Sequence, residues 1–476
     1  MRILFAASEG IPFVKGGIQS DMIGYLPKEL KKQKIDVRVI LPNYGDIPLQ
    51  LRERMAWKKN FTVPLAWRNQ FCDLQELIYD EIPYYFIDSK YYFNREGLYG
   101  FDDDAERYAF FCRAVLEALP HLDFQPQIIH CHDWQTGMIS VFLKTHYNEN
   151  PFYKNIRTVF TIHNLNNQGI FSKEILGDLL SLGEEYFTME TLEFYGQLSY
   201  MKGGLSFSDV LTTVSKTYAE EIQSSYFGKN LDGFLRKRQK DLYGISNGID
   251  YNVYNPATDP YIFTTYQRSL RKKMENKTKL QKLLNLPVKK DIPLIAVISP
   301  FNISRGIDMI ISGIEELLTM DIQMVIMGKG DGKYEMQLMH AAKQYPDKVS
   351  VNISLDESLA RKIYAASDMF LIPSLIEPCC IKQLIALRYG SIPIVSETGS
   401  LKDTIQPFDV NTGEGNGFKF TGYKLRDMIE VTKKAINMFY NKELWYKIIK
   451  NAMKTNYGWD KTAKQYYNLY EFLLDK

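Results

Sequence analysis

The chain alternates short apolar runs with amphipathic stretches, and it does so in two successive series. RILFAA (residues 2–7) and VRVIL (37–41) have the length and composition of buried parallel strands, and the segment 21–32 between them has helical apolar spacing. A strand, a glycine-containing turn, a helix and a strand in this order make a βαβ unit. A second series begins near residue 294. The pattern therefore predicts an α/β protein with two Rossmann-like, doubly wound domains that face a cleft.

The remaining elements follow the same alternation, except that residues 55–100 are less regular and rich in Tyr, Phe and Trp. Further strands are predicted at 82–88, 127–130, 158–162, 209–214, 294–298, 323–327, 349–353, 369–372 and 392–395. Helices are predicted at 104–119 and 307–318, from Glu357, from Ile381, and over most of 425–476.

The length of 476 residues is too great for one ordinary core. The segment 254–260 (YNPATDP) has two prolines and few apolar residues, as an interdomain linker would. We therefore expect a first domain at 1–257 and a second at 258–457. We also expect a C-terminal helix, about residues 458–476, to pack back on the first domain.

Composition narrows the class of protein but not its activity. The net charge of +2 does not favour nucleic acid or an anionic membrane as a partner. The aromatic content of 13% fits an aromatic-rich core, and also stacking platforms for sugar rings; composition alone favours the core. Five cysteines without paired spacing disfavour a disulfide framework. The first apolar run is too short for a signal peptide or a membrane span, so we expect a cytoplasmic protein.

Polar residues follow several predicted strands directly, where open α/β sheets bind ligands. The clearest case is SLIEPCCIKQ (374–383), which places Glu377 between a strand and a helix. Judged alone, a ligand-binding Glu377 and a solvated loop glutamate are about equally favoured. His130, His132 and Asp133 suggest a metal site, but His130 should face the sheet and no second cluster completes a ligand shell. We therefore expect no metal and no cofactor.

A glycine pair, Gly16-Gly17, precedes the first predicted helix. Such a pair could admit a phosphate to the helix N-terminus, although a plain tight turn is at least as well supported by these residues alone.

Over nearly its full length the chain resembles the bacterial glycogen synthases and plant starch synthases. The matching stretches are ASEGIPFVK, LPKELKK, VRVILPNY, GLYGFDDDAERYAFF, IIHCHDWQTGM, TVFTIHNLNNQGIF, LTTVSKTYAEEI, GISNGIDYNVYNPATDP, EPC, RYGSIPIV and WDKTAKQY. This resemblance implies the GT-B glycosyltransferase fold, with a glucan-binding first domain and a nucleotide-sugar-binding second domain. It also implies metal-independent, retaining transfer of glucose from ADP-glucose to the non-reducing end of an α-1,4-glucan.

The resemblance assigns roles to individual positions. Glu377 would hold hydroxyls of the donor glucose, and the carbonyl of His163 would lie near its anomeric carbon. Lys15 and Arg305 would serve the donor diphosphate. The remaining expected donor- and sugar-binding residues are Gly17, Asp21, Asp133, Asn247, Gly328 and Cys380.

The sequence departs from the family mainly where the family holds the nucleotide phosphates. Pro300 replaces an arginine, and Arg305 replaces a lysine. Ile18, Cys380 and Ser400 each stand where the family has a glycine. If Pro300 removes a bidentate contact, about 3–5 kcal/mol of leaving-group stabilisation is lost, or roughly a hundred- to a few-thousand-fold in rate.

Three interpretations remain open from the sequence. The leading one is a working synthase whose phosphate contacts have moved, for example to Lys329 or Lys382. The second is a non-catalytic homologue that binds glucan or an active synthase. The third is a glycosyltransferase with another donor.

Overall fold

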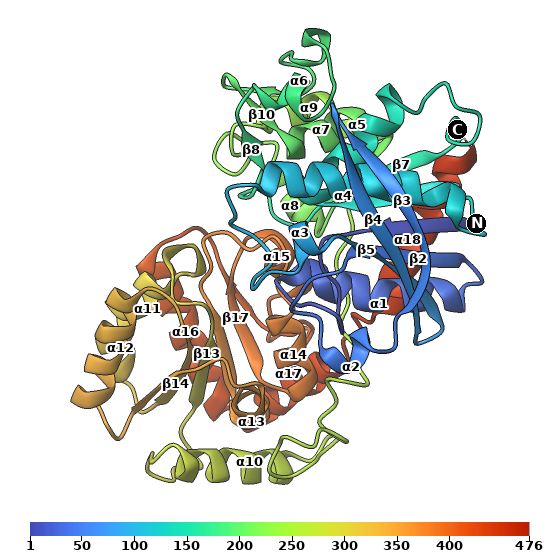
Figure 1. Ribbon diagram of the computed structural model, residues 1–476. Helices are drawn as coiled ribbons and strands as arrows, with labels where there is room; N and C mark the ends of the chain where they lie inside the picture. Colours follow the sequence, from blue (N-terminus) through green and yellow to red (C-terminus); the bar gives the residue numbers. More distant parts are fainter. Residues whose placement is uncertain (476) are drawn as a thin grey trace. The chain divides into compact units, whose positions relative to one another are not determined.

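The structure is a computed structural model that describes residues 1–475. The chain divides into two compact units: residues 1–246 together with the C-terminal segment from Trp459 (unit 1), and residues 247–458 (unit 2) (Figure 1). The division lies ahead of the segment 254–260 for which the sequence predicts a linker. That segment packs into unit 2, where the buried Asp259 carboxylate accepts hydrogen bonds from Arg361 and Tyr389.

Unit 1 is built on a nine-stranded sheet in the order β12-β11-β7-β6-β1-β2-β5-β4-β3. The strands are β1 (Arg2–Ala6), β2 (Asp36–Pro42), β3 (Ala56–Leu65), β4 (Arg68–Tyr79), β5 (Ile82–Asp88), β6 (Ile128–His132), β7 (Arg157–Ile162), β11 (Val210–Thr213) and β12 (Leu242–Gly244). Pairing is parallel from β12 to β5, whereas β4 is antiparallel to both β5 and β3. A small antiparallel sheet of β8 (Ile170–Phe171), β10 (Gln197–Ser199) and β9 (Glu193–Phe194) is formed by the segment between β7 and β11.

Helices flank this sheet, and the last helix of the chain belongs to the first unit. The helices of unit 1 are α1 (Ile18–Lys32), α2 (Leu49–Arg52), α3 (Lys90–Phe93), α4 (Asp104–Ala118), α5 (Gly137–Thr145), α6 (Ile175–Asp178), α7 (Tyr200–Phe207), α8 (Lys216–Glu221), α9 (Asp232–Lys237) and α18 (Trp459–Asp475). Trp459 stacks on Tyr25 of α1 with ring centroids 6.0 Å apart. The hydroxyl of Tyr470 lies 2.8 Å from Nδ1 of His130 in β6, so α18 is bonded to the centre of the sheet.

Unit 2 has a six-stranded, wholly parallel sheet in the order β15-β14-β13-β16-β17-β18. Its strands are β13 (Leu294–Ile298), β14 (Gln323–Gly328), β15 (Val349–Ile353), β16 (Met369–Ile372), β17 (Ile392–Ser396) and β18 (Phe418–Phe420). Its helices are α10 (Leu270–Leu283), α11 (Ile307–Leu318), α12 (Gly332–Gln344), α13 (Glu357–Ala366), α14 (Lys382–Tyr389), α15 (Gly399–Thr404), α16 (Leu425–Tyr440) and α17 (Lys442–Lys454). The central strands are almost entirely buried, as expected for a parallel sheet covered on both faces.

The predicted α/β class with two parallel-sheet units is confirmed. Several predicted strands have the observed bounds, among them 82–88 and 369–372, and most others differ by one or two residues at an end. The main addition is the long β3–β4 hairpin, which falls in the aromatic stretch that the sequence pattern left irregular.

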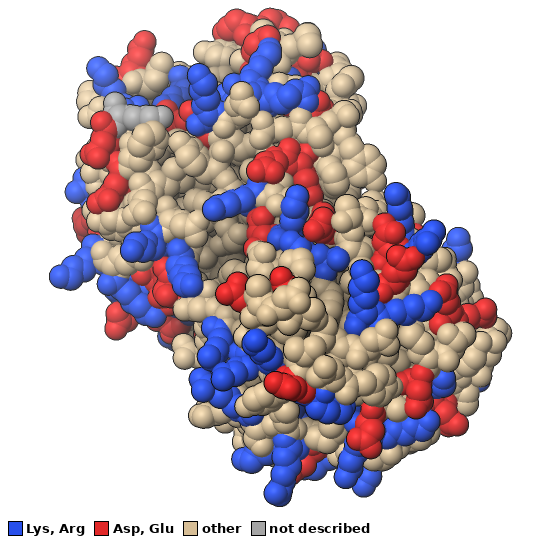
Figure 2. Space-filling model, turned by 180° about the vertical axis from the view of Figure 1, so that it is seen from behind, with Lys and Arg blue, Asp and Glu red and all other residues tan. Residues whose placement is uncertain are grey.

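Acidic and basic side chains are interspersed in small groups over the face drawn in Figure 2, in keeping with the small net charge. Among residues 1–475, no helix is both long and apolar enough to cross a membrane.

Candidate active site

In unit 1, polar residues gather where three neighbouring parallel strands, β1, β6 and β7, reach their carboxyl ends. Asp133, directly after β6, has φ 56° and ψ −179°. This backbone region is used almost only by glycine, and it costs another residue about 1–3 kcal/mol. The carboxylate of Asp133 helps to hold the conformation, because its Oδ1 accepts the backbone N–H of His163 at 2.8 Å.

Burial changes the protonation of these residues. Burial is the main cause that raises the pKa of Asp133 to about 7, and the nearby Glu9 carboxylate raises it further. Burial likewise lowers the pKa of His163 to about 3, so its imidazole is neutral at physiological pH. Strained backbone and shifted pKa values at a strand end are typical of a functional site.

Glu9 organises the glycine loop ahead of α1. The backbone N–H groups of Gly16 and Gly17 both donate to Oε2 of Glu9, the latter at 2.7 Å. Glu9 is buried, and burial raises its pKa although the two N–H groups oppose the shift. The two donors that could bind a phosphate are therefore occupied by a carboxylate of the same chain. This role of Glu9 was not predicted, and its only signal in the sequence is an acidic residue between a buried strand and a glycine loop.

Lys15 and Asp21 lie at the same loop and form an ion pair at 3.8 Å. The lysine side chain is 59% exposed, so it is available to an anionic ligand, and the pair adds little to stability.

In unit 2, Glu377 follows β16 and is only 4% exposed. Its Oε2 accepts a hydrogen bond from the hydroxyl of Ser374 at 2.9 Å, and its Oε1 is paired with the Nη1 of Arg305. The attraction of Glu377 is the largest cause that raises the pKa of Arg305. The carboxylate and the cation that the sequence assigns to sugar and diphosphate are thus bound to each other.

Two glycines allow this arrangement. Gly306 has φ +74°, and a Cβ there would collide with the backbone carbonyl of Pro373. Gly399 has φ +44°, and a Cβ there would collide with the backbone carbonyl of Glu377. Because both positions need left-handed backbone and close approach, only glycine suits them. At these two glycines the starts of α11 and α15 pack directly against the backbone of Pro373 and Glu377.

Cys380 and Ser400, two of the departures from the family, bind each other. The hydroxyl of Ser400 accepts the backbone N–H of Cys380 at 2.8 Å. The Cys380 thiol is buried, which raises its pKa to about 12 and keeps it protonated. Burial is also the main cause that lowers the pKa of the neighbouring Lys382. The backbone donor at Cys380 is therefore already in use.

The structure places the other sequence-predicted residues as follows. Gly328 is the last residue of β14 and packs against the backbone carbonyl of Ser299. Pro300 directly follows Ser299, whose N–H donates to Met327 at 3.0 Å. Asn247 begins unit 2 and is buried, yet neither polar atom of its side chain has a hydrogen-bond partner within residues 1–475. A buried amide without partners is costly, so Asn247 is suited to meet a ligand.

Three pairs of predicted site residues are in contact: Asp133 with His163, Lys15 with Asp21, and Arg305 with Glu377. The first two lie in unit 1 and the third in unit 2. The catalytic and binding roles of all ten predicted residues stay predictions. Within residues 1–475, no group of three or more His, Cys, Asp or Glu side chains is arranged to hold a metal ion.

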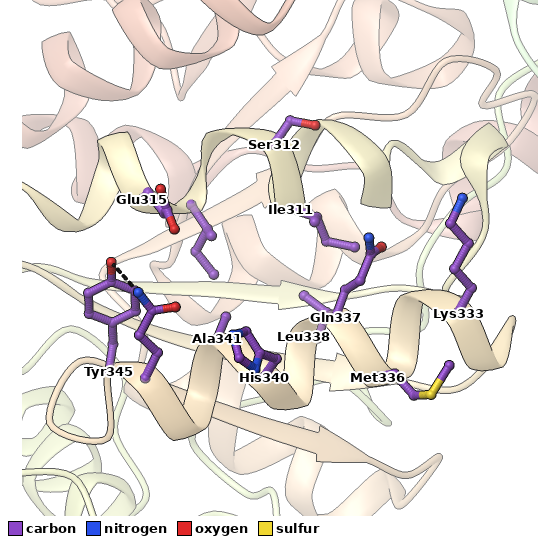
Figure 3. A pocket seen from close by; sticks show the side chains of 12 residues that line it. Ile311, Ser312, Glu315, Lys333, Met336, Gln337, Leu338, His340, Ala341 and Tyr345 are labelled. Atoms are coloured by element: carbon purple, nitrogen blue, oxygen red, sulfur yellow. Dashed lines mark hydrogen bonds between the residues drawn. The ribbon is translucent and has the colours of Figure 1, made fainter.

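A separate groove of about 490 Å³ lies between α11 and α12 of unit 2 (Figure 3). Apolar side chains form its floor, and Lys333, Gln337, His340 and Tyr345 lie along it. None of the predicted site residues lines this groove.

Comparisons with known proteins give the family of both units. The family model "Starch synthase catalytic domain" matches residues 2–237, and "Glycosyl transferases group 1" matches residues 281–455. The chain is 54% identical to a glycogen synthase of Desulforamulus reducens, over 100% of this chain and 99% of the relative. It is 52% identical to a glycogen synthase of Alkaliphilus metalliredigens, over 99% of this chain and all of the relative.

Solved structures extend the comparison. The catalytic domain of starch synthase IV from Arabidopsis thaliana, bound to ADP and acarbose, superposes with a TM-score of 0.90 at 30% identity. The match covers 100% of this chain and 99% of that one. A sucrose-phosphate synthase from Thermosynechococcus elongatus shares the fold with a TM-score of 0.62 at 15% identity, over 100% and 99% of the two chains.

These matches span both units at high identity, and the fold is that of the GT-B glycosyltransferases. The chain therefore belongs to the glycogen and starch synthase family and is a hexosyltransferase of that type.

Proposed function

We propose that the protein transfers glucose from ADP-glucose to the non-reducing end of an α-1,4-glucan, with retention of configuration and without a metal ion. The relatives that support this are named glycogen synthase, and a structural neighbour binds ADP and acarbose. The observation that carries the proposal is Glu377, which is held buried at the carboxyl end of β16 beside Arg305.

The reaction needs charge stabilisation at two places. The bond between the anomeric carbon and the diphosphate breaks, and the acceptor hydroxyl oxygen bonds to that carbon. The hydroxyl proton passes to the departing phosphate, so ADP and the extended glucan are formed. The sugar becomes electron-poor in the transition state while the diphosphate gains charge.

In unit 2, Glu377 suits the sugar side, because a buried carboxylate can hold sugar hydroxyls by charge-assisted hydrogen bonds. Arg305 suits the diphosphate side, because its guanidinium matches phosphate oxygens. Binding of the donor then replaces the Arg305–Glu377 pair with two ligand contacts.

In unit 1, the backbone carbonyl of His163 would lie near the anomeric carbon, and Asp133 would lie at the sugar site. Lys15 and the N–H groups of Gly16 and Gly17 suit the diphosphate, since exposed cations and backbone donors bind phosphate without a metal ion. Glu9, which holds both N–H groups, has to yield them to such a ligand.

The departures from the family act on the diphosphate side of this scheme. Pro300 has no N–H and no cationic side chain, and the Cys380 N–H is engaged by Ser400. Arg305 and Lys15 remain, and Lys382 is the first residue of α14, close enough to Glu377 and Arg305 for both charges to act on its pKa. We therefore expect a working enzyme whose phosphate contacts are fewer than those of its relatives.

The test is incorporation of labelled glucose from ADP-glucose into glycogen, with UDP-glucose as the donor control. Incorporation with ADP-glucose above the no-enzyme background supports the proposal. No incorporation with retained glycogen binding rejects it and identifies a non-catalytic glucan-binding homologue.

A companion variant tests whether the departures limit the rate. Pro300→Arg combined with Cys380→Gly restores the family residues at two phosphate-side positions. We expect the double variant to incorporate more label than the parent protein. Unchanged incorporation would show that other residues have replaced those contacts.

A further inference from the structure

His132 contacts His163 through their rings. Nδ1 of His132 lies 3.1 Å from Nε2 of His163, which is within hydrogen-bond distance. The second ring nitrogen of each residue, Nε2 of His132 and Nδ1 of His163, is buried without a partner among residues 1–475. The two imidazoles thus share one hydrogen bond and have two unpaired nitrogens.

The ring of His132 is held rigidly by the sheet. It stacks on Phe5 of β1 with centroids 5.6 Å apart and planes 16° apart. His130, two residues earlier on the same face of β6, has its ring 4.2 Å from that of His132 and 4.8 Å from that of Phe5, so the three rings pack as one cluster. His130 is itself anchored at both nitrogens, by Tyr470 at 2.8 Å and Thr161 at 2.6 Å. The ring of His132 is therefore held in one orientation and can fix the orientation of the His163 ring that contacts it.

Because both rings are neutral, each carries a single N–H, and the shared bond couples the two tautomers. If His132 donates from Nδ1, then Nε2 of His163 is bare and its proton sits on Nδ1. If His163 donates from Nε2, its Nδ1 is a bare acceptor and His132 carries an unpaired N–H on Nε2. The state of His132 thus decides whether Nδ1 of His163 donates or accepts.

The two arrangements differ in where the unpaired N–H lies. His132 is fully buried, at 0% exposure, whereas His163 is 4% exposed and belongs to the candidate site. An unpaired buried N–H is rarer than an unpaired acceptor, and it is tolerated best where a ligand or water can reach it. This favours donation by His132.

We propose that His132 is a positioning residue that donates from Nδ1 to Nε2 of His163, and so presents the Nδ1–H of His163 as a hydrogen-bond donor to an oxygen of the bound sugar. The proposal rests on the proposed function only for the identity of the ligand. The coupling between the rings is a property of the unliganded protein.

The first test reads the tautomer directly, without activity. Long-range ¹H–¹⁵N spectra distinguish the two neutral forms of histidine, and the chain has only six histidines to assign. We expect His163 to be protonated at Nδ1 in the parent protein and to shift towards the Nε2–H form in His132→Leu. A His163 tautomer that is Nε2–H in the parent, or that is unchanged in the variant, would overturn the proposal.

The second test uses a matched pair of substitutions. The asparagine and leucine side chains have nearly the same shape, but only asparagine places an N–H donor near the position of Nδ1 of His132. With ADP-glucose and glycogen we expect kcat/KM to fall roughly 10- to 100-fold in His132→Leu. His132→Asn should recover most of that loss. Equal losses in both variants at equal melting temperature would show that His132 has only a packing role.

His146→Leu is the control, because His146 is another histidine of unit 1 and its ring lies 3.0 Å from the carbonyl oxygen of Ser181 instead. It should leave kcat/KM unchanged. If the parent protein proves inactive with ADP-glucose, the proposed function fails, while the spectra still decide whether His132 sets the tautomer of His163.

Discussion

The two units prepare their polar residues in different ways. In unit 1 the candidate site contains a strained backbone at Asp133, a carboxyl pKa raised to about 7 and two neutral histidines with unpaired nitrogens. In unit 2, Arg305 is paired with Glu377 and Cys380 with Ser400, while the side-chain amide of Asn247 is buried without a partner in the described part of the chain. Ligand binding should therefore relieve unfavourable terms in unit 1, whereas in unit 2 it replaces favourable contacts everywhere except at Asn247.

This difference indicates what each unit contributes to specificity. Unpaired polar groups at a rigid strand end favour a ligand that forms hydrogen bonds with them, and sugar hydroxyls can do so. A preformed ion pair has to open, so a nucleotide that lacks the sugar competes with an internal carboxylate.

The largest effect is expected for Glu377→Gln, which removes the carboxylate but keeps the shape of the side chain. We expect kcat to fall about 100- to 1000-fold in the glucose-incorporation assay, because the electron-poor sugar loses its buried anion. Glu397→Gln is the matched control in the same unit, since the carboxylate of Glu397 contacts Lys419 at 3.8 Å and the hydroxyl of Thr421 at 3.2 Å rather than Arg305. If Glu377→Gln kept parental kcat, the assignment of Glu377 to the sugar side would be wrong.

Asp133→Asn should make the folded protein more stable at alkaline pH. The pKa of Asp133 is raised from 3.8 to about 7 in the folded protein, so the folded state keeps its proton between these values while the unfolded state releases it. The cost of burying the charge is absent below pH 3.8, grows as the pH rises and is complete above about 7.

The expected gain in the free energy of unfolding of Asp133→Asn is up to about 4 kcal/mol at pH 8 and less at pH 5. Denaturant titrations at the two pH values measure it. An equal gain in the free energy of unfolding at pH 5 and pH 8 would mean that the ionised carboxylate of Asp133 does not destabilise unit 1.

A smaller effect is expected for Ser400→Ala, which releases the backbone N–H of Cys380. One more free donor on the phosphate side should lower the KM for ADP-glucose roughly 3- to 10-fold, with kcat little changed. Ser391→Ala is the control, because Ser391 is a buried serine of unit 2 that bonds Ser367 at 2.7 Å. An unchanged KM would show that the Cys380 N–H does not face the phosphates.

The smallest effect is expected for Glu9→Gln. The amide oxygen can still accept the N–H groups of Gly16 and Gly17, but the negative charge beside a bound diphosphate is gone. We expect the KM for ADP-glucose to fall roughly 2- to 5-fold. A rise in KM would instead mean that the charge of Glu9 is needed to hold the loop for the ligand.

The sequence predicts the parts of this molecule that depend on local pattern. Buried parallel strands such as 294–298 and 369–372 were predicted within their observed bounds, because apolar runs between turn signals leave few alternatives. The β3–β4 hairpin was not predicted, because the edge strand β3 and its neighbour β4 expose residues such as Trp57 and Phe71 and so lack a clean apolar alternation.

The candidate site shows the same limit. A strand-end position such as Glu377 follows from topology, which the sequence reveals. The backbone angle of Asp133, the hold of Glu9 on the glycine loop and the bond between Ser400 and Cys380 depend on neighbours distant in sequence. The resemblance to the synthases marked Cys380 and Ser400 as two separate departures, whereas the structure joins them in one hydrogen bond.

Until the donor binds, Arg305 and Glu377 of unit 2 should stay paired with each other. Calorimetric titration of ADP, which has the diphosphate but no sugar, into the parent protein and into Glu377→Gln measures this pairing. We expect ADP to bind roughly 3- to 10-fold more tightly to Glu377→Gln, because Arg305 is no longer held by an anion. Equal or weaker binding of ADP by the variant would contradict it.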